Sequence, residues 1–241
     1  MGWGKFYGIG VGPGDPELLT LKAKRILEEI EVLFVPKSKT ETRSLALTIV
    51  ADIIDKNWEC HELLLPMTRD EELLQQSWQE AARQVIEVIK SGRDAAFITL
   101  GDPSLYSSFT YIFRHLKQLA PLAEVEIVPG VSSINSLAAW IQEPLAVGNE
   151  SLLIVPAGLE KDKISALMEQ TDNILLLKAG PEIEKIKAIL LEQPNTQRAF
   201  LVSRNGFADS FYTDDLNGLE AQKFDYLSTV LIKKNREGSK V

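Results

Sequence analysis

The chain of 241 residues has little of the chemistry that cysteine and histidine provide: one cysteine, Cys60, and two histidines, His61 and His115. A single cysteine excludes a framework of internal disulfides and any metal site built from several cysteines. Two histidines are too few for a histidine-rich zinc centre, so we expect no resident metal. A cysteine–histidine nucleophile pair is conceivable, but no pattern in the sequence places these residues together.

Positive charge is also scarce. The chain has 26 Lys and Arg but 34 Asp and Glu, so its formal net charge is −8. A chain this acidic repels nucleic acid and anionic membrane surfaces, so we expect neither as a partner. No run approaches the roughly 18 apolar residues of a membrane span. The first five residues do not form the apolar region of a signal peptide. We therefore predict a cytoplasmic protein.

What is present is an ordinary globular composition, 45% hydrophobic and 25% charged, in which strand and helix patterns alternate. A short apolar strand is expected at 6–11. Ala23, Ile26, Leu27 and Ile30 then share one helix face. Further elements are expected as a strand at 31–35 that Pro36 ends, helices at 44–54 and 70–90, a strand at 94–100 and a helix after it. This alternation favours a parallel sheet covered on both faces.

The second half continues in the same α/β style beyond Pro121, where we place the boundary between a domain 1–120 and a domain 121–241. Strands are expected at 125–128, 152–155, 174–177, 199–202 and 229–232, and helices from about 131 to 140, at 160–169 and at 181–192. The tail from 235 is polar and is expected to fray.

The strongest local signal is loop 1 (residues 8–16, GIGVGPGDP), which follows the first strand and holds four glycines. Glycines let a backbone approach a ligand closely, and a simple turn would need only one or two. The dinucleotide pattern G-x-G-x-x-G fails here, because its third glycine would fall on Pro13 or Asp15. The second strand ends in Pro36 and Lys37 instead of an acidic residue. Pro13 also offers no N–H to a phosphate, so the loop is not suited to pyrophosphate.

Two more polar loops follow expected strands: loop 2 (100–108, LGDPSLYSS) and loop 3 (129–133, PGVSS). Ligands in open α/β sheets bind at the carboxyl ends of strands, where these loops lie. Helix capping is the alternative, with Asp102 or Ser104 and Ser132 as N-caps. Capping does not explain Gly101 or the polar run that ends loop 2. Three such loops together favour a small-molecule cleft between the domains.

The stretch from Val11 to Ala23 resembles the opening signature of the tetrapyrrole methylases, and loops 2 and 3 resemble that family's second and third signatures, in order and spacing. The resemblance covers about residues 6–232. Residues 101–109 and the strand end 35–37 are most similar to the branch that methylates C20 of precorrin-2 or its cobalt form.

The resemblance implies two α/β domains, an N-terminal one with a mostly parallel sheet and a C-terminal one with a mixed sheet, and an active site in the cleft between them. It implies S-adenosylmethionine as methyl donor, S-adenosylhomocysteine as product, a tetrapyrrole substrate and a homodimer. The cofactor contacts that it implies fall on Pro13, Leu100, Gly101, Asp102, Leu105, Tyr106, Ser107, Ser132, Ser133, Ala179 and Thr229. A larger Met is frequent in relatives where this chain has Ala179.

No catalytic residue is assigned, because the sulfonium of the donor is already activated and the protein has mainly to align the reactants. The substrate carries several carboxylates, so its side of the site should present cations. Lys37, Lys39 and Arg43 are our hypothesis for that cluster, and a solvated charged loop is the equal alternative.

Two other interpretations stay open. One is a sister methylase that acts at another carbon or on uroporphyrinogen III. The other is a non-catalytic module that binds a small ligand.

Overall fold

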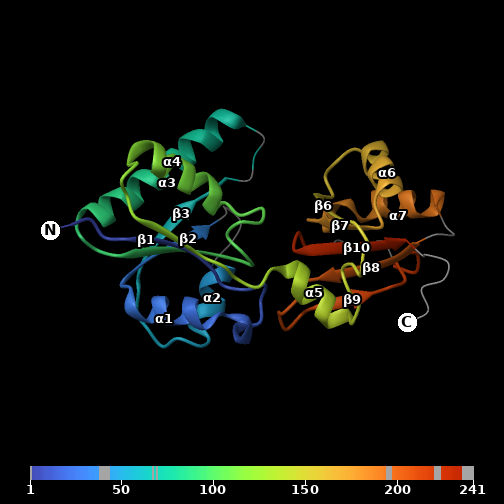
Figure 1. Cartoon of the computed structure of the whole chain (residues 1–241), viewed down its shortest axis with the longest axis horizontal. Coiled ribbons are helices and arrows are strands. Elements are labelled where there is room, and N and C mark those ends of the chain that lie inside the picture. Colours follow the sequence, from blue (N-terminus) through green and yellow to red (C-terminus); the bar gives the residue numbers. More distant parts are fainter. Residues whose placement is uncertain are drawn as a thin grey trace. The chain divides into compact units, whose positions relative to one another are not determined.

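The computed structural model describes residues 2–37, 44–66, 68, 70–193, 197–219 and 224–234. The chain forms two compact units, 1–133 and 134–241 (Figure 1). The division falls 13 residues beyond the expected 120/121 boundary. The reason is that β5 (Val125–Val128) pairs with β1 (Phe6–Gly10) in the first sheet, and α5 (Ser133–Ile141) follows it.

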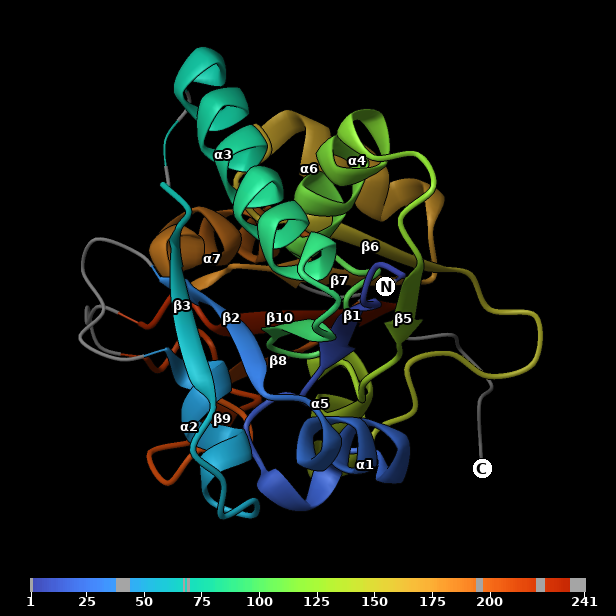
Figure 2. The ribbon, with the colours of Figure 1, turned by 90° about the vertical axis from the view of Figure 1, so that its left-hand side faces the viewer.

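The first unit contains a five-stranded sheet in the order β3-β2-β4-β1-β5, and every neighbouring pair is parallel. Figure 2 shows β3 and β5 at its two edges. The other strands are β2 (Val32–Lys37), β3 (Glu59–Leu64) and β4 (Ala95–Thr99). All five residues of β4 are buried, as expected for a central parallel strand that is covered on both faces.

Helices cover both faces of this sheet, α1 (Leu21–Glu29) and α2 (Leu45–Ala51) on one and α3 (Glu71–Lys90) and α4 (Phe109–Leu119) on the other (Figures 1 and 2). A short 3-10 turn, η1 (Pro16–Leu18), precedes α1. Thr20 begins α1 by accepting from the N–H of Ala23, and Asp70 begins α3 by accepting from Leu73. The rings of Trp78 and Tyr111 stack at 4.0 Å and so join α3 to α4.

The second unit contains a five-stranded mixed sheet in the order β6-β7-β10-β8-β9. β6 (Leu152–Pro156) and β7 (Asn173–Leu177) are parallel, whereas β10 (Ser228–Lys234) runs antiparallel to both β7 and β8 (Gln197–Ser203). β9 (Phe211–Thr213) forms the edge beside β8. The remaining elements are α6 (Lys161–Gln170), the 3-10 turn η2 (Gly180–Glu182) and α7 (Ile183–Glu192).

The predicted fold class is thus confirmed for both sheets. The observed strands differ from the expected ones at the end of β2 and in two additional edge strands. β2 does not end before Pro36 but continues to Lys37. Its pairing with β4 stops at Phe34, while its pairing with β3 continues, so Pro36 lies where only one neighbour is present. The edge strands β3 and β9 were not predicted, because mostly exposed and polar or short segments carry little periodic signal.

No helix within the described ranges is long and apolar enough to cross a membrane.

Candidate functional site

Loops 1, 2 and 3 follow the carboxyl ends of three adjacent parallel strands, so they lie at the same end of the first sheet. β1 ends at Gly10, β4 ends at Thr99 and β5 ends at Val128, and the three strands are parallel neighbours in the order β4-β1-β5. The carboxyl ends of parallel strands are where open α/β sheets bind ligands. The parallel topology therefore brings together loops that lie up to 120 residues apart in the sequence.

Glycines make the close approach of the loops possible. An isolated antiparallel bridge joins Gly12 to Gly101, in which the N–H of Gly101 donates to the oxygen of Gly12 over 2.7 Å. A Cβ on Gly10 would lie 2.5 Å from the carbonyl oxygen of Gly101, and one on Gly130 would lie 2.2 Å from the same oxygen. Side chains at either position would force the loops apart. These glycines serve loop-to-loop packing, a role that the sequence did not reveal.

Asp102 joins loop 2 to loop 3. One carboxylate oxygen accepts from the backbone N–H of Gly130 over 2.9 Å, and the other accepts from the N–H and the hydroxyl of Ser104. Burial alone would raise the pKa of Asp102, but these hydrogen bonds outweigh it and hold the pKa below its ordinary value. Asp102 is therefore an ionised side chain whose two oxygens hold loops 2 and 3 together.

The capping interpretation of loop 2 is wrong, because α4 begins at Phe109, with Ser108 as its N-cap residue. Ser107, predicted to touch the cofactor, is 7% exposed and is engaged within the loop. Its hydroxyl donates to that of Thr99 over 3.0 Å and accepts from the N–H of Phe109 over 3.2 Å. Tyr106, by contrast, is 50% exposed and has a left-handed φ of 51°. Of these two predicted contacts, Tyr106 has the accessible side chain.

The charged side chains of the three loops are all acidic. The loops contain Asp15 and Asp102 and no lysine or arginine. A site for a phosphorylated ligand would need cations or a cradle of N–H groups, and Pro13 has no N–H to offer. An ionised carboxylate beside uncharged backbone instead favours a ligand with positive charge, such as a sulfonium or an ammonium group.

The two remaining predicted cofactor residues, Ala179 and Thr229, belong to the second unit and lie near each other there. Thr229 pairs with Leu177 in the β10–β7 ladder, and the N–H of Ala179 donates to the oxygen of Ser228 over 2.8 Å. Both side chains are buried.

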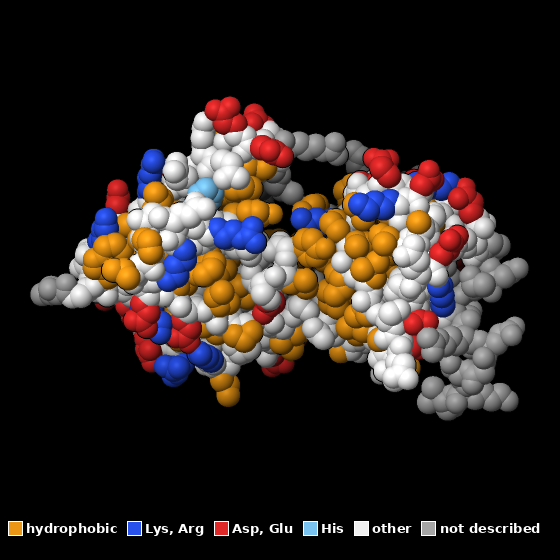
Figure 3. Space-filling model, turned by 45° about the horizontal axis from the view of Figure 1, so that its top comes forward, with side chains coloured by type: hydrophobic (Ala, Val, Ile, Leu, Met, Phe, Trp, Pro, Cys, Tyr) orange, Lys and Arg blue, Asp and Glu red, His pale blue; other side chains and the backbone are white. Residues whose placement is uncertain are grey.

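The cationic cluster predicted for the substrate is only partly described. Lys37 lies at the end of β2, and its ammonium pairs with the carboxylate of Glu62 over 2.6 Å. Lys39 and Arg43 fall outside the described residues. On the face shown in Figure 3, acidic and basic side chains are intermixed, without a continuous basic stripe of the kind that binds nucleic acid.

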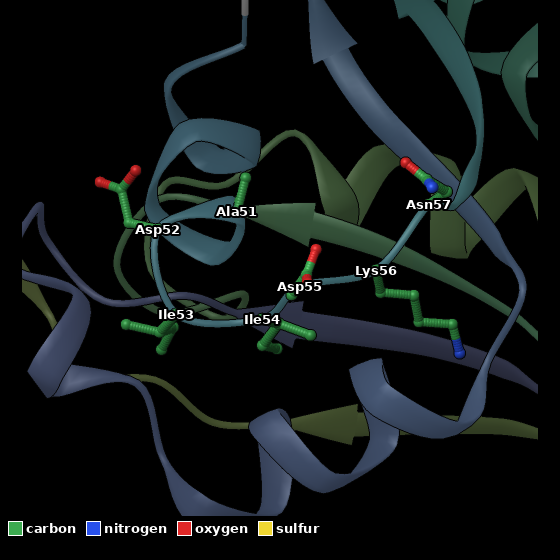
Figure 4. Close-up of a pocket in the computed structure, with 7 residues that line it drawn as sticks. All are labelled: Ala51, Asp52, Ile53, Ile54, Asp55, Lys56 and Asn57. Atoms are coloured by element: carbon green, nitrogen blue, oxygen red, sulfur yellow. The ribbon is translucent and has the colours of Figure 1, made fainter.

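One hollow in the first unit is not part of this loop cluster. Its volume is about 550 Å³, and its lining comes from one consecutive segment, 51–57, at the end of α2 and in the connection to β3 (Figure 4). None of the predicted site residues lines it. In the described portion of the chain, no three His, Cys, Asp or Glu residues are grouped to hold a metal ion.

A family model described as tetrapyrrole (corrin/porphyrin) methylases matches residues 5–217. The chain belongs to this family. The match includes all three loops, and so the predicted family is confirmed.

Among curated proteins, a probable cobalt-precorrin-2 C(20)-methyltransferase of Methanocaldococcus jannaschii is 46% identical over 160 residues, 66% of each chain. The cobalt-precorrin-2 C(20)-methyltransferase of Salmonella typhimurium is 30% identical over 235 residues, 97% of this chain and 98% of the relative. Among solved structures, a uroporphyrin-III C-methyltransferase of Thermus thermophilus, in complex with S-adenosylhomocysteine, has a TM-score of 0.65. It is 20% identical and covers 95% of this chain and 97% of that one, so it supports the fold.

Proposed function

We propose that this chain transfers a methyl group from S-adenosylmethionine to C20 of cobalt-precorrin-2. The observation that carries the proposal is the identity of 46% and 30% to two proteins that bear this activity in their names, the second over 97% of the chain. The uroporphyrin-III enzyme that shares the fold binds the demethylated product of the same donor. The donor supplies a methyl group on an activated sulfonium.

The residues of the first unit fit such a donor better than a nucleotide. We propose that loops 1, 2 and 3 hold it, through backbone groups near Pro13, Leu100, Gly101, Leu105, Ser132 and Ser133. The ionised Asp102 supplies the negative charge that a sulfonium or an ammonium favours. Ala179 and Thr229 in the second unit stay predicted contacts.

The protein's contribution is then mainly to orient the reactants. Holding two reactants in the right geometry contributes up to about 7–11 kcal/mol to lowering a barrier, and no nucleophilic side chain is needed for that. The hydrogen bonds that lower the pKa of Asp102 make it a weak base for accepting the C20 proton.

Two measurements test the proposal, one of ligand binding and one of methyl transfer. Purified protein is titrated by calorimetry with S-adenosylhomocysteine and, separately, with NAD. It is then incubated with S-adenosylmethionine and cobalt-precorrin-2, metal-free precorrin-2 or uroporphyrinogen III. We expect binding of S-adenosylhomocysteine, no binding of NAD, and one added methyl group on cobalt-precorrin-2. Methylation of uroporphyrinogen III alone would instead identify a sister methylase, and binding without any methylation would identify a ligand-binding module.

The predicted homodimer and cytoplasmic location remain predictions. Trp140, an apolar residue of α5, packs edge to face on Tyr212 at 5.3 Å within the second unit. Light scattering on the purified protein measures the oligomeric state directly.

A further inference from the structure

Lys178 has an unusual backbone conformation at the carboxyl end of β7. Its φ is 59°, in the left-handed region that residues with a side chain rarely adopt. The residue before it, Leu177, is the last of β7 and pairs with Thr229 of β10. Outliers of this kind persist where the surrounding structure fixes them, and they gather at functional sites.

The surroundings fix Lys178 firmly. The next residue, Ala179, donates its N–H to the oxygen of Ser228 over 2.8 Å. Gly180 then packs against the turn 224–228 so closely that a Cβ there would lie 2.1 Å from the oxygen of Asp225. The bend after β7 is thus held against the turn that precedes β10.

The turn 224–228 is itself braced from β8. Arg204, just after the end of β8, donates to the Asp225 carboxylate over 3.1 Å, and the other carboxylate oxygen accepts from the N–H of Leu227 over 2.6 Å. The hydroxyl of Ser228 donates to the oxygen of Asp225 over 2.6 Å. Tyr226 lies in the middle of this turn, so its position relative to Lys178 is set before any ligand arrives.

The ammonium of Lys178 lies 5.3 Å from the centre of the Tyr226 ring. It has no carboxylate within ion-pair distance among the residues that the structure describes. The neighbouring Arg204, by contrast, pairs with both Asp209 and Asp225. In a chain with 34 acidic residues, a lysine that is fixed in place yet paired only with an aromatic ring retains its capacity for an external anion.

We propose that Lys178 binds a carboxylate of the tetrapyrrole, with the Tyr226 ring as an aromatic surface beside it. This inference rests on the proposed function, since it assigns a polycarboxylate substrate to the same enzyme. An ammonium forms a charge-assisted hydrogen bond with a carboxylate. Tyr226 is 39% exposed, so part of this residue is accessible to a flat apolar ring. Lys37, the only described residue of the earlier cationic cluster, already has a carboxylate partner in Glu62.

The test compares three variants of the whole protein. Lys178→Asn removes the charge and keeps a residue that tolerates a left-handed φ, and Lys178→Arg keeps the charge. The matched control is Lys90→Asn, because the Lys90 ammonium lies 5.2 Å from the ring of Trp3, in a similar cation–π pair of the first unit. For each protein, the dissociation constant of cobalt-precorrin-2 is measured without methyl donor, and that of S-adenosylhomocysteine is measured separately.

We expect Lys178→Asn to weaken the binding of cobalt-precorrin-2 about tenfold or more, with little change for S-adenosylhomocysteine. Lys178→Arg should restore most of the affinity, and Lys90→Asn should match the wild type. An unchanged tetrapyrrole affinity in Lys178→Asn would overturn the inference while leaving the proposed function intact. Equal losses for both ligands would also overturn it, because they would show a structural role. Failure of the wild type to bind cobalt-precorrin-2 would overturn both proposals.

Discussion

The backbone N–H of Gly130 donates to a carboxylate oxygen of Asp102 over 2.9 Å, across 28 positions of sequence. The other oxygen of the same carboxylate accepts from the N–H of Ser104 over 2.8 Å. One side chain therefore sets the shape of loop 2 and ties it to loop 3. If these loops hold the methyl donor, Asp102 acts on affinity through their positions.

Asp102→Ala should weaken both the fold and the binding of the donor. It leaves the part-buried N–H of Gly130 and the exposed N–H of Ser104 without their acceptor, and the loss of a typical hydrogen bond costs about 0.5–1.5 kcal/mol. We expect a lower free energy of unfolding in urea and at least a tenfold weaker affinity for S-adenosylhomocysteine.

Asp70→Ala is the matched control, since Asp70 also accepts a backbone N–H, that of Leu73, but at the start of α3. Loss of this N-cap should cost about 1 kcal/mol of stability and leave the affinity for S-adenosylhomocysteine as in the wild type. Equal affinities in the Asp102 and Asp70 variants would show that loop 2 does not hold the donor.

Gly130→Ala should be among the most damaging single substitutions in the first unit. The new Cβ would lie 2.2 Å from the oxygen of Gly101, and the atoms it meets are backbone. Forced overpacking of this kind typically costs about 1–3 kcal/mol and would separate the loops. Thermal unfolding and S-adenosylhomocysteine titration measure both effects. At Gly158, where a Cβ would meet only Glu182 at 4.0 Å, alanine should be tolerated; equal damage at both sites would argue against a close loop contact.

Glu126 should stabilise the fold near neutral pH and lose this contribution in acid. Hydrogen bonds from Lys22 and Lys5 lower the pKa of Glu126 from its ordinary 4.5 to about 2. A carboxyl with a depressed pKa in the folded state stabilises the fold above its unfolded pKa and loses this contribution as pH falls through the folded value. The contribution of Glu126 should therefore disappear between about pH 4.5 and about pH 2. Urea unfolding of Glu126→Gln across this window should show a flatter pH dependence than the wild type; an identical slope would refute the coupling.

The cationic cluster proposed from the sequence is tested by the double substitution of Lys37 and Arg43 with Gln. If these residues bind substrate carboxylates, the KM for the tetrapyrrole should rise and the KM for the methyl donor should not. Lys37 would have to leave Glu62, with which it pairs at 2.6 Å, and this exchange should reduce its share of the effect. An unchanged tetrapyrrole KM would remove both residues from the substrate site.

Much of the fold follows from the sequence because its central elements carry strong patterns. The helix face of Ala23, Ile26, Leu27 and Ile30 is buried as expected, and the apolar stretch 95–99 forms the buried centre of a parallel sheet. The edge strands were harder to predict, since β3 is mostly exposed and β9 has only three residues. The sequence also did not show that the strand at 125–128 belongs to the first sheet, because local patterns cannot reveal pairing with a strand 119 residues earlier.

For the candidate site, the sequence predicted which loops matter but not how they are built. Spacing alone placed loops 1, 2 and 3 at strand ends. It could not show that Gly10, Gly101 and Gly130 pack backbone to backbone, or that Asp102 spans two loops instead of capping a helix. The sequence did not indicate a role for Lys178, because its left-handed φ and its contact with the Tyr226 ring depend on a turn about 50 residues away.

The most direct measurement is the position of the transferred methyl group. The protein is incubated with cobalt-precorrin-2 and S-adenosylmethionine that carries ¹³C in its methyl group, and the product is examined by mass spectrometry and ¹³C NMR. The account predicts one labelled methyl group, bonded to C20. A label at any other carbon, or no label in the tetrapyrrole, would contradict it.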